Sequence, residues 1–334
     1  MKSFDKLKKW LCIKDSLKLF NRPERGLYST ENIPNGKIII KVKSKFLIEY
    51  QQINKLYLID DIEEINSLVA FYLVKLYIEN NEFYSSYLDT FPSDLTEHIY
   101  YWSKHDIKYI KNTSVTTEGF TNLSSHINSY KNDFDIINEY NKIHNIIEID
   151  DEDFYNIFIR FRILVGSRIF GYVKYGEETS GMIPYIDMIN HSTESNTTWY
   201  FSDSLDAFVL ESTQDIPKGK EIVDNYGSKT NIEFLLFYGF TLNPNPNPVL
   251  RINIDDIPIE LNLSSTLDYD KDFIQKITKK IKILENNHKT IIKNVKINNI
   301  NLLNIINDEI VVINYIINYL LSKLNISYIF PPRS

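Results

Sequence analysis

The spacing of apolar residues changes along the chain, and each change predicts a different kind of element. Residues 3 to 19 place apolar side chains at nearly helical intervals between lysines, which predicts one amphipathic helix. A β-branched run follows the Pro-Asn-Gly turn at 34 to 36 and, with the residues before the turn, predicts a pair of strands. The chain is therefore expected to open with a helix and a small β unit.

The middle third of the chain has the apolar spacing of helices. From about residue 50 to 165, apolar residues recur three and four positions apart over stretches of ten or more residues. From 181 to 240 short apolar runs alternate with turn residues, which predicts strands, before helical spacing returns in the last ten residues. We therefore expect helices inserted between two groups of strands.

Prolines at alternate positions mark a break at 242 to 248. Successive prolines cannot continue a helix or a central strand, so this segment is stiff and turn-prone. The residues beyond it have basic or all-round apolar helical patterns. We expect a domain boundary at this segment and a helical tail after it.

Composition places the chain among ordinary globular proteins. It has 334 residues, 43% of them hydrophobic and 24% charged, and a prior of roughly 150 residues per domain gives about two domains. No uninterrupted apolar run reaches the ~18 residues that indicate a membrane helix. The lysine-rich start lacks an apolar run of secretory length. These features predict an intracellular protein, cytoplasmic or nuclear, that is not secreted.

Charge and residue content disfavour several function classes. Lysine and arginine number 37 against 44 aspartate and glutamate, a net charge of −7, which disfavours binding to nucleic acid by bulk attraction. The single cysteine, Cys12, allows neither an intramolecular disulfide nor a cysteine-based zinc cluster. The run at 227 to 230 resembles the end of a phosphate-binding loop but lacks the preceding glycine. No metal site is expected, because zinc-site spacing is absent from the six histidines, His98, His105, His126, His144, His191 and His288.

Three segments combine residues that composition alone would not place together. The first, at 23 to 30, sets Arg25 beside Gly26, so that a fixed positive charge accompanies a glycine that permits close backbone approach. An arginine beside a turn glycine is more often structural when it is considered alone. The first segment therefore needs support from the other two.

The second and third segments end apolar runs in polar or aromatic residues. The run at 181 to 192 ends in Asn190 and His191, whose polar groups require partners from a ligand or from a satisfied core. In the third, at 216 to 240, a strand delivers Tyr226 into a glycine turn. The helix that follows brings Tyr238 and Phe240. A lone tyrosine usually packs as an amphipathic side chain, so packing and function both stay open for each segment.

Taken in order, the three segments resemble the SET-domain methyltransferases, in particular the branch typified by plant Rubisco large-subunit lysine methyltransferase. In that family an Arg/Gly-rich turn, an Asn-His pair and a late tyrosine meet around S-adenosylmethionine, because one segment threads through a loop formed by another. Such threading is rare among folds, so the order of the motifs is informative. The resemblance covers roughly residues 5 to 250.

Further motifs carry the same resemblance. LVGSRIF, with Arg168, is similar to the Ser-Arg that precedes the family's Pro-x-x-Asp-Met-x-Asn-His strand, whose aspartate is Asp187 here. YGSKTNIEFLLFYGF is close to the family's Tyr-x-x-x-Ser-Asn-x-Glu-Leu-x-x-x-Tyr-Gly-Phe. In the opening turn this chain departs from the family, because Glu24 stands where a first glycine is common.

The resemblance implies an α+β protein: a β-rich SET fold with a threaded pseudoknot, interrupted by a helical insertion and followed by an all-helical C-terminal domain. Residues 1–50 would form the N-terminal part of the SET domain, 51–180 the helical insertion and 181–243 the C-terminal part of the SET domain. Residues 244–334 would form the tail, which resembles a substrate-binding domain in placement and helical character only.

The resemblance also implies roles for single residues around S-adenosylmethionine. Tyr226 would be the catalytic residue, placed beside the transferring methyl group. Asn190 and His191 would hold the amino-acid end and the adenine edge of the cofactor. Arg168 and Asp187 would orient the cofactor carboxylate and the substrate channel. The remaining walls would come from Glu24, Arg25 and Gly26 on one side and from the aromatic rings of Tyr238 and Phe240.

These features predict a methyltransferase that acts on a lysine of a protein substrate, as a monomer that binds neither nucleic acid nor membrane. A related branch methylates histidine and has Trp where this chain has Ile186 and Asn where it has Phe170, so lysine is favoured. No cysteine-rich segment follows Tyr226, unlike in the zinc-containing histone-directed branch. Three alternatives stay open: methylation of a histidine, as in that related branch, an inactive SET scaffold that only binds peptides, and a helical adaptor that recruits a partner through its tail.

Overall fold

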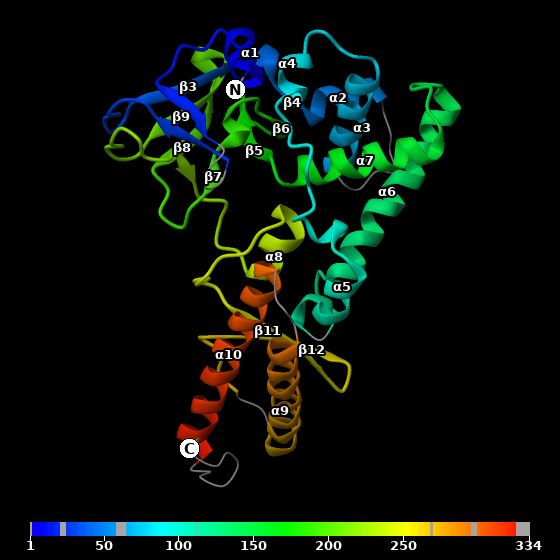
Figure 1. Ribbon diagram of the computed structural model, residues 1–334, viewed down its shortest axis with the longest axis vertical. Coiled ribbons are helices and arrows are strands. Elements are labelled where there is room, and N and C mark those ends of the chain that lie inside the picture. The colour runs from blue at the N-terminus through cyan, green and yellow to red at the C-terminus, as the bar shows by residue number, and fades with distance from the viewer. Residues whose placement is uncertain are drawn as a thin grey trace. The chain divides into compact units, whose positions relative to one another are not determined.

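A computed structural model of the chain describes residues 2–20, 25–57, 65–111, 113–267, 270–294 and 299–324. The chain forms two compact units, each assembled from two stretches of sequence. The first unit comprises Met1–Ser93 and Tyr130–Gly227, and the second comprises Asp94–Ser129 and Ser228–Ser334. Figure 1 colours their elements along the chain.

The first unit combines helices with short strands, which confirms the predicted α+β class. Its helices are α1 (Lys2–Trp10), α2 (Tyr50–Tyr57), α3 (Ile65–Ile78), α4 (Ser85–Leu88) and α7 (Asp151–Gly166), while α6 (Leu123–His144) begins in the second unit's sequence and ends in the first. Its strands are β1 (Leu17–Phe20), β2 (Gly26–Ser29), β3 (Ile38–Lys43), β4 (Ile48–Glu49), β5 (Ile169–Lys174), β6 (Glu177–Met182), β7 (Asn190–His191), β8 (Thr197–Ser202), β9 (Ala207–Ser212) and β10 (Val223–Asp224). Single 3-10 turns lie at Ser44–Phe46, Ile186–Met188 and Asp203–Leu205.

The strands of the first unit bring together segments that are far apart in sequence. Among the described residues they form two antiparallel sheets, of order β3-β9-β8 and β4-β6-β5, an antiparallel pair β1-β2 and a parallel pair β7-β10. Strand β3 thus lies beside β9, which is more than 160 residues further along the chain (Figure 1). The candidate site lies where the parallel pair forms.

The opening of the chain differs from the sequence prediction in two ways. Helix α1 ends at Trp10, and Leu19 lies in strand β1, because Leu17–Phe20 form a ladder with β2 instead of continuing the helix. The two strands around the Pro-Asn-Gly turn are present, but they do not pair with each other. The turn leads toward β9, since the N–H of Gly36 donates to the carbonyl of Ser212.

The helical middle of the chain is confirmed, and its core in the first unit is aromatic. Phe71 of α3 and Phe154 of α7 are fully buried, with ring centroids 6.1 Å apart. A buried polar network crosses the same helices: Arg162 Nε donates to Ser67 Oγ at 2.7 Å, and Ser67 donates to Asp133 of α6. A hydrogen-bonded buried network favours one register of the helices, so the insertion forms a rigid support.

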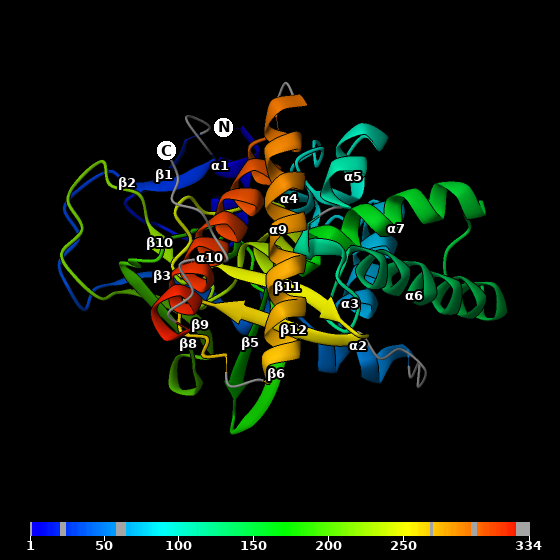
Figure 2. The same cartoon turned by 90° about the horizontal axis from the view of Figure 1, so that it is seen from below.

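The second unit is helical, as predicted for the tail, but it is not all-helical. Its helices are α5 (Lys104–Ile110), α8 (Asn231–Glu233), α9 (Lys271–Asn294) and α10 (Ile300–Leu324), with a π-helix at Phe234–Tyr238 and single 3-10 turns at Ile99–Tyr101 and Ser114–Thr116. Strands β11 (Val249–Ile254) and β12 (Ile257–Asn262) form an antiparallel hairpin. Both turn residues, Asp255 and Asp256, have positive φ, 49° and 63°, which suits a tight hairpin turn. Apolar alternation in both strands buries one face against α9 and α10 (Figure 2).

The two compact units divide the chain at other points than the predicted boundaries. Residues 94–129, expected within the insertion, share a core with the tail, in which Ile99 and Val115 cluster with Leu235 and Leu302. The second stretch of this unit begins at Ser228, ahead of the proline-rich segment. The roles assigned to the predicted domains, such as the likeness of the tail to a substrate-binding domain, stay predictions.

Helix α10 is the most apolar long helix of the second unit. By length and composition its stretch Ile300–Ser322 is sufficient to cross a membrane, and 61% of an 18-residue window within it is buried inside the structure. Ile305, Val312 and Ile316 are at most 1% exposed and lie in the core clusters of the unit. Packing in the core accounts for the apolar character of this helix.

Candidate active site

The first contact of the site joins the start of strand β2 to strand β7. Asn190 Nδ2 donates to the Arg25 carbonyl and to Glu221 Oε1, each at 2.8 Å. A Cβ at Gly26 would lie 2.2 Å from that Glu221 oxygen and 2.9 Å from Asn190 Nδ2. Gly26 therefore allows two polar side chains to close against the backbone, which is the close approach expected from the sequence.

Glu221 anchors this contact between the start of β2 and β7. Glu221 was not among the site residues predicted from the sequence. Its Oε2 accepts the Tyr28 hydroxyl at 3.2 Å, and its carbonyl accepts Asn196 Nδ2 at 2.8 Å. The only signal in the sequence is a charged residue directly before the apolar Ile222, a position that usually faces solvent. Its role depends on Tyr28, 193 residues away, which no local pattern reveals.

The parallel pairing of β7 with β10 brings Tyr226 to the Asn-His pair. Val223 pairs with Asn190, and Asp224 pairs with His191. The Tyr226 N–H donates to His191 Nδ1 at 3.1 Å, and the two ring centroids are 5.2 Å apart. Because Nδ1 accepts this bond, a neutral His191 carries its proton on Nε2.

The Tyr226 side chain has a defined direction. Its hydroxyl donates to the Ile189 carbonyl at 2.6 Å, so the phenol is held beside the residues that precede β7. Gly227 follows with φ 98°, which forms the glycine turn that the sequence predicted. Strand β10 and this turn therefore place an oriented phenol oxygen next to the Asn190–His191 strand.

A buried ionic cluster lies two residues before Ile189. The Tyr87 hydroxyl, from α4, donates to Asp187 Oδ2 at 2.6 Å. Arg168 Nη1 donates to the Asp187 carbonyl at 2.7 Å and lies 3.7 Å from Oδ2. Burial raises the pKa of the Asp187 carboxyl, and the charge of Arg168 opposes that rise. Tyr87 had no signal in the sequence, because it reaches the site from 100 residues away.

Arg25 adds a second positive charge to this cluster. Its Nη2 donates to the Thr90 carbonyl, just after α4, at 2.8 Å. Burial lowers the pKa of Arg25, the charge of Arg168 lowers it further, and Asp187 opposes both effects. Two arginines thus share the space around one carboxylate. The excess of positive charge suits a ligand that carries an anionic group.

Two polar atoms of the cluster are buried and have no hydrogen-bond partner among the described residues. They are Asp187 Oδ1 and Arg168 Nε. Buried polar atoms in proteins are nearly always paired, so these two indicate where polar groups of a ligand can bind. An ammonium group can donate to the first, and a carboxylate can accept from the second. An α-amino acid carries both groups.

The structure brings together seven of the ten predicted site residues, all in the first unit: Arg25, Gly26, Arg168, Asp187, Asn190, His191 and Tyr226. Glu24 lies outside the described residues. Tyr238 and Phe240 belong to the second unit, where Phe240 stacks on Phe234 with centroids 5.0 Å apart. Their part in a cofactor pocket stays a prediction. Among the described residues, no three His, Cys, Asp or Glu side chains form a group that could hold a metal ion.

The chain is similar in sequence to known methyltransferases. The family model of the SET domain matches residues 24–227. The actin-histidine N-methyltransferases of Rhinolophus ferrumequinum and Homo sapiens are 24% identical to it over 241 residues, which is 69% of this chain and 40% of each of those proteins. SET domain-containing protein 8 of Schizosaccharomyces pombe is 39% identical over 87 residues, 26% of this chain and 20% of that protein. The chain thus spans at most about two fifths of these relatives.

Solved structures share the fold over nearly the whole chain. The SET domain of LSMT bound to lysine and AdoHcy matches with a TM-score of 0.71 at 15% identity, covering 97% of this chain and 92% of that chain. Rubisco LSMT bound to AdoMet matches with a TM-score of 0.65 at 14% identity, covering 99% and 97%. At these identities the likeness is one of fold.

Proposed function

The chain belongs to the SET domain family, and from that membership we propose that it methylates a lysine side chain of a protein substrate with S-adenosylmethionine. The observation that carries the proposal is the Tyr226 hydroxyl, held on the Ile189 carbonyl beside the Asn190–His191 strand. The actin-histidine N-methyltransferases and the LSMT structures support the same class of reaction.

The residues of the site fit S-adenosylmethionine. This cofactor supplies a methyl group on a positively charged sulfur, and its other end is an α-amino acid. Arg168 Nε and Asp187 Oδ1, both buried without a described partner, match the carboxylate and the ammonium group of that end. Asn190 and His191 would hold the amino-acid end and the adenine edge, with Arg25 and Gly26 on the facing wall.

A lysine must lose its proton before its nitrogen can attack a methyl group, since the free side chain has a pKa near 10.4. Burial lowers the pKa of an amine, and a neighbouring positive charge lowers it further. In this site burial and Arg168 lower the pKa of Arg25, while Asp187 opposes both effects. An incoming lysine would likewise be buried, and the positive charge on the sulfur of the cofactor would further favour its neutral, reactive form.

Tyr226 contributes by orienting the amine. Its hydroxyl donates to the Ile189 carbonyl, and a phenol oxygen that donates its proton can still accept a hydrogen bond from an amine N–H. The amine lone pair is then held in one direction, as an in-line displacement requires. Orientation of this kind can contribute roughly 7 to 11 kcal/mol to the lowering of a barrier.

Two side chains favour lysine over histidine. A histidine that attacks through one ring nitrogen keeps its proton on the other, and that N–H needs an acceptor. Phe170 packs its ring 5.2 Å from Trp199 and 5.5 Å from Phe208, and Ile186 is 0% exposed. The Asn that the histidine-methylating branch has in place of Phe170 could accept that N–H, whereas Phe170 and Ile186 have no polar atom that could do so.

Histidine methylation is the second candidate function. The observation in its favour is the 24% identity to actin-histidine N-methyltransferases over 69% of this chain. A histidine acceptor would have to find the partner for its second nitrogen at a position other than 170 or 186. The identity of the methylated residue, lysine or histidine, decides between the two candidate functions.

Replacement of Tyr226 by phenylalanine tests the proposed catalytic role. We expect Tyr226→Phe to lower methyl transfer about a hundredfold, since the oriented phenol oxygen is lost, and to change the affinity for S-adenosylmethionine by less than about threefold, since it removes no bond to the cofactor. Tritium transfer from labelled S-adenosylmethionine to purified actin and to lysate proteins measures the first. Calorimetry measures the second.

Tyr200→Phe is the matched control, because the hydroxyl of Tyr200 on β8 donates to Glu211 of β9 in an exposed hydrogen bond, and neither residue is among those of the candidate site. It should transfer methyl groups like the wild type. An equal loss of transfer and of cofactor affinity in Tyr226→Phe would contradict the catalytic role. No transfer by the wild-type chain to any protein would favour the inactive scaffold or the helical adaptor.

Mass spectrometry of the labelled proteins identifies the acceptor. We expect the added 14 Da methyl mass on a lysine, because Phe170 and Ile186 cannot accept an imidazole N–H. Phe170→Asn should then raise transfer to histidine-containing peptides relative to lysine-containing ones. A mark found only on histidine in the wild type would replace the first candidate by the second.

A further inference from the structure

A surface cavity of about 410 Å³ lies in the first unit, on the hairpin of β5 and β6 beside the start of α2. Tyr50 and Ile65 line it from the helical side, and Gly171, Glu178 and Ser180 line it from the hairpin. None of these residues belongs to the candidate active site described above. The cavity is therefore distinct from that site.

The hairpin register explains why the cavity is open. Gly171 lies opposite Ser180, and residues two apart on a strand face the same side, so Glu178 joins them on this face. A Cβ at Gly171 would meet only Ser180 Oγ, at 3.8 Å, which leaves the floor unfilled. Gln51 holds the rim in place, because its Nε2 donates to the Glu178 carbonyl at 2.7 Å and its Oε1 accepts from Thr179.

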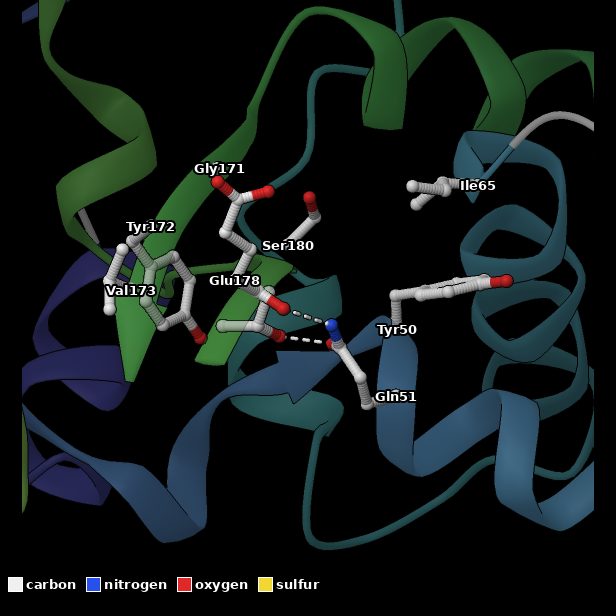
Figure 3. A pocket seen from close by; sticks show the side chains of 9 residues that line it. Tyr50, Gln51, Ile65, Gly171, Tyr172, Val173, Glu178 and Ser180 are labelled. Carbon is white, nitrogen blue, oxygen red and sulfur yellow. Dashed lines mark hydrogen bonds between the residues drawn. The ribbon is translucent and has the colours of Figure 1, made fainter. Parts of the chain in front are cut away.

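The cavity combines one negative charge with an aromatic ring and an aliphatic side chain. Figure 3 shows the Tyr50 ring and Ile65 on one side of the hollow, and the Glu178 carboxylate with the Ser180 hydroxyl on the other. Within the described part of the chain, the Glu178 carboxylate makes neither a hydrogen bond nor an ion pair. Glu178 is exposed, so a ligand can reach it without rearrangement of the hairpin.

This combination suits an arginine side chain. A guanidinium group is flat, stacks on aromatic rings and binds a carboxylate through two N–H groups. Its aliphatic stem packs along apolar surface such as that of Ile65. Lysine would supply only a point charge, which uses the flat Tyr50 ring and the paired oxygens of Glu178 less well. We propose that the cavity binds an arginine side chain of the protein substrate.

The assignment of that arginine to the substrate rests on the proposed methyl transfer. Strand β5 starts directly after Arg168 of the candidate active site and carries Gly171 and Val173 at the cavity. A strand rises about 3.3 Å per residue, so the cavity lies roughly 10 to 17 Å along β5 from Arg168. An extended peptide covers about the same length per residue. Arg168 binds the Asp187 carbonyl, two residues before the Ile189 carbonyl that binds the Tyr226 hydroxyl, so the start of β5 lies near the place of methyl transfer. The arginine should therefore stand about three to five positions from the methylated residue.

Binding of arginine amide to the full chain, labelled with ¹⁵N at its glycines, tests the cavity without any reaction. We expect arginine amide to shift the Gly171 amide signal and to leave the signal of Gly36, which has no atom near its Cβ position, unchanged. Glutamate amide should shift neither. Glu178→Gln should weaken the apparent affinity about fivefold through loss of the ion pair.

Glu177→Gln is the matched control, since Glu177 precedes Glu178 on β6 and faces the opposite side of the hairpin. It should bind arginine amide like the wild type. The Gly171 signal is assigned by its disappearance in Gly171→Ala, a change for which the structure has room. A Gly171 signal that does not respond, or that responds equally in Glu178→Gln, overturns the proposal.

Peptides with one central lysine and one arginine, moved from one to seven positions on either side, test the link to the substrate. Wild type and Glu177→Gln should transfer several-fold more tritium where the arginine stands about three to five positions away, whereas Glu178→Gln should lose that preference. Equal transfer at every spacing by the wild type overturns the assignment to the substrate. No transfer to any peptide or lysate protein contradicts the methyltransferase proposal instead, while the result with arginine amide stands separately.

Discussion

Gly26 shows how a single missing side chain can shape the candidate site. The space that its Cβ would fill is occupied by Glu221 Oε1 and Asn190 Nδ2, which bond to each other across it. Both atoms are the ends of side chains that can move, so a larger residue would displace them without unfolding the strand. The cost of such a change falls mainly on the geometry of the site.

We therefore expect Gly26→Ala to weaken binding of S-adenosylmethionine by about tenfold and to cost only about 1 kcal/mol of stability. Calorimetric titration and urea unfolding measure the two effects. The control is Gly171→Ala, the same change within strand β5, where the nearest atom lies at an ordinary 3.8 Å. Cofactor binding by Gly26→Ala that equals that of Gly171→Ala would show that the close approach at Gly26 is unimportant.

Whether a single site residue could be predicted depended on how far along the chain its partners lie. Asn190, His191 and Tyr226 belong to compact motifs, which the sequence displays as a unit. Glu221 and Tyr87 have partners far away in the sequence: Glu221 binds Tyr28, 193 residues away, and Tyr87 binds Asp187, 100 residues away. A pairwise contact over such a distance leaves no local pattern, so these two side chains emerge only from the fold.

At the scale of elements, periodicity identified long helices better than short strands. The helices of the middle third were predicted because their apolar spacing persists over ten or more residues. Strand β1 has only four residues, and its apolar positions also fit a helical pattern that continues from α1. The hairpin β11–β12 was missed for another reason: the helical patterns that follow it dominated the prediction for the whole tail.

Helix α10 carries a buried carboxyl group, that of Asp308, whose ionisation lowers the stability of the folded chain. Asp308 is 9% exposed and lies beside Asn231 of α8 and Glu309 of its own helix, which pairs with His288 of α9 at 2.8 Å. Burial raises the pKa of Asp308 to about 7, with a smaller rise from Glu309 and an opposing effect of Asn231. In the unfolded chain the same group would titrate near 3.9.

The sign of the pH effect follows from these two values. Between about pH 4 and pH 7 the unfolded chain loses this proton while the folded chain keeps it, so the contribution of Asp308 to stability falls as the pH rises. Asp308→Asn keeps the shape of the protonated acid and removes this loss. We expect it to be more stable than the wild type at pH 8 by roughly 1 to 2 kcal/mol, less than the full pKa difference because solvent reaches part of the group.

Urea unfolding at several pH values between 4 and 8 measures that difference. Asp256→Asn, an exposed aspartate in the turn of the same unit, serves as the control and should follow the pH dependence of the wild type. A difference between Asp308→Asn and wild type that stays constant from pH 4 to pH 8 would contradict the raised pKa.

At the scale of the whole molecule, the order of motifs predicted the SET fold more reliably than any single pattern. Three segments far apart in the sequence are informative together because few folds bring such segments to one place. The division into compact units was not predictable in the same way. Helical spacing at 94–129 shows that these residues have an apolar face, but not that this face joins the core of the tail.

The pairing of β3 with β9 has a consequence for how this chain is made. Strand β3 leaves the ribosome more than 160 residues before its partner, and at a synthesis rate of 5 to 20 residues per second it waits roughly 10 to 30 seconds with an open edge. An open strand edge is a template for association with other chains. Early folding of the nascent protein therefore depends on what shields Ile40 and Val42 until residue 212 has been added.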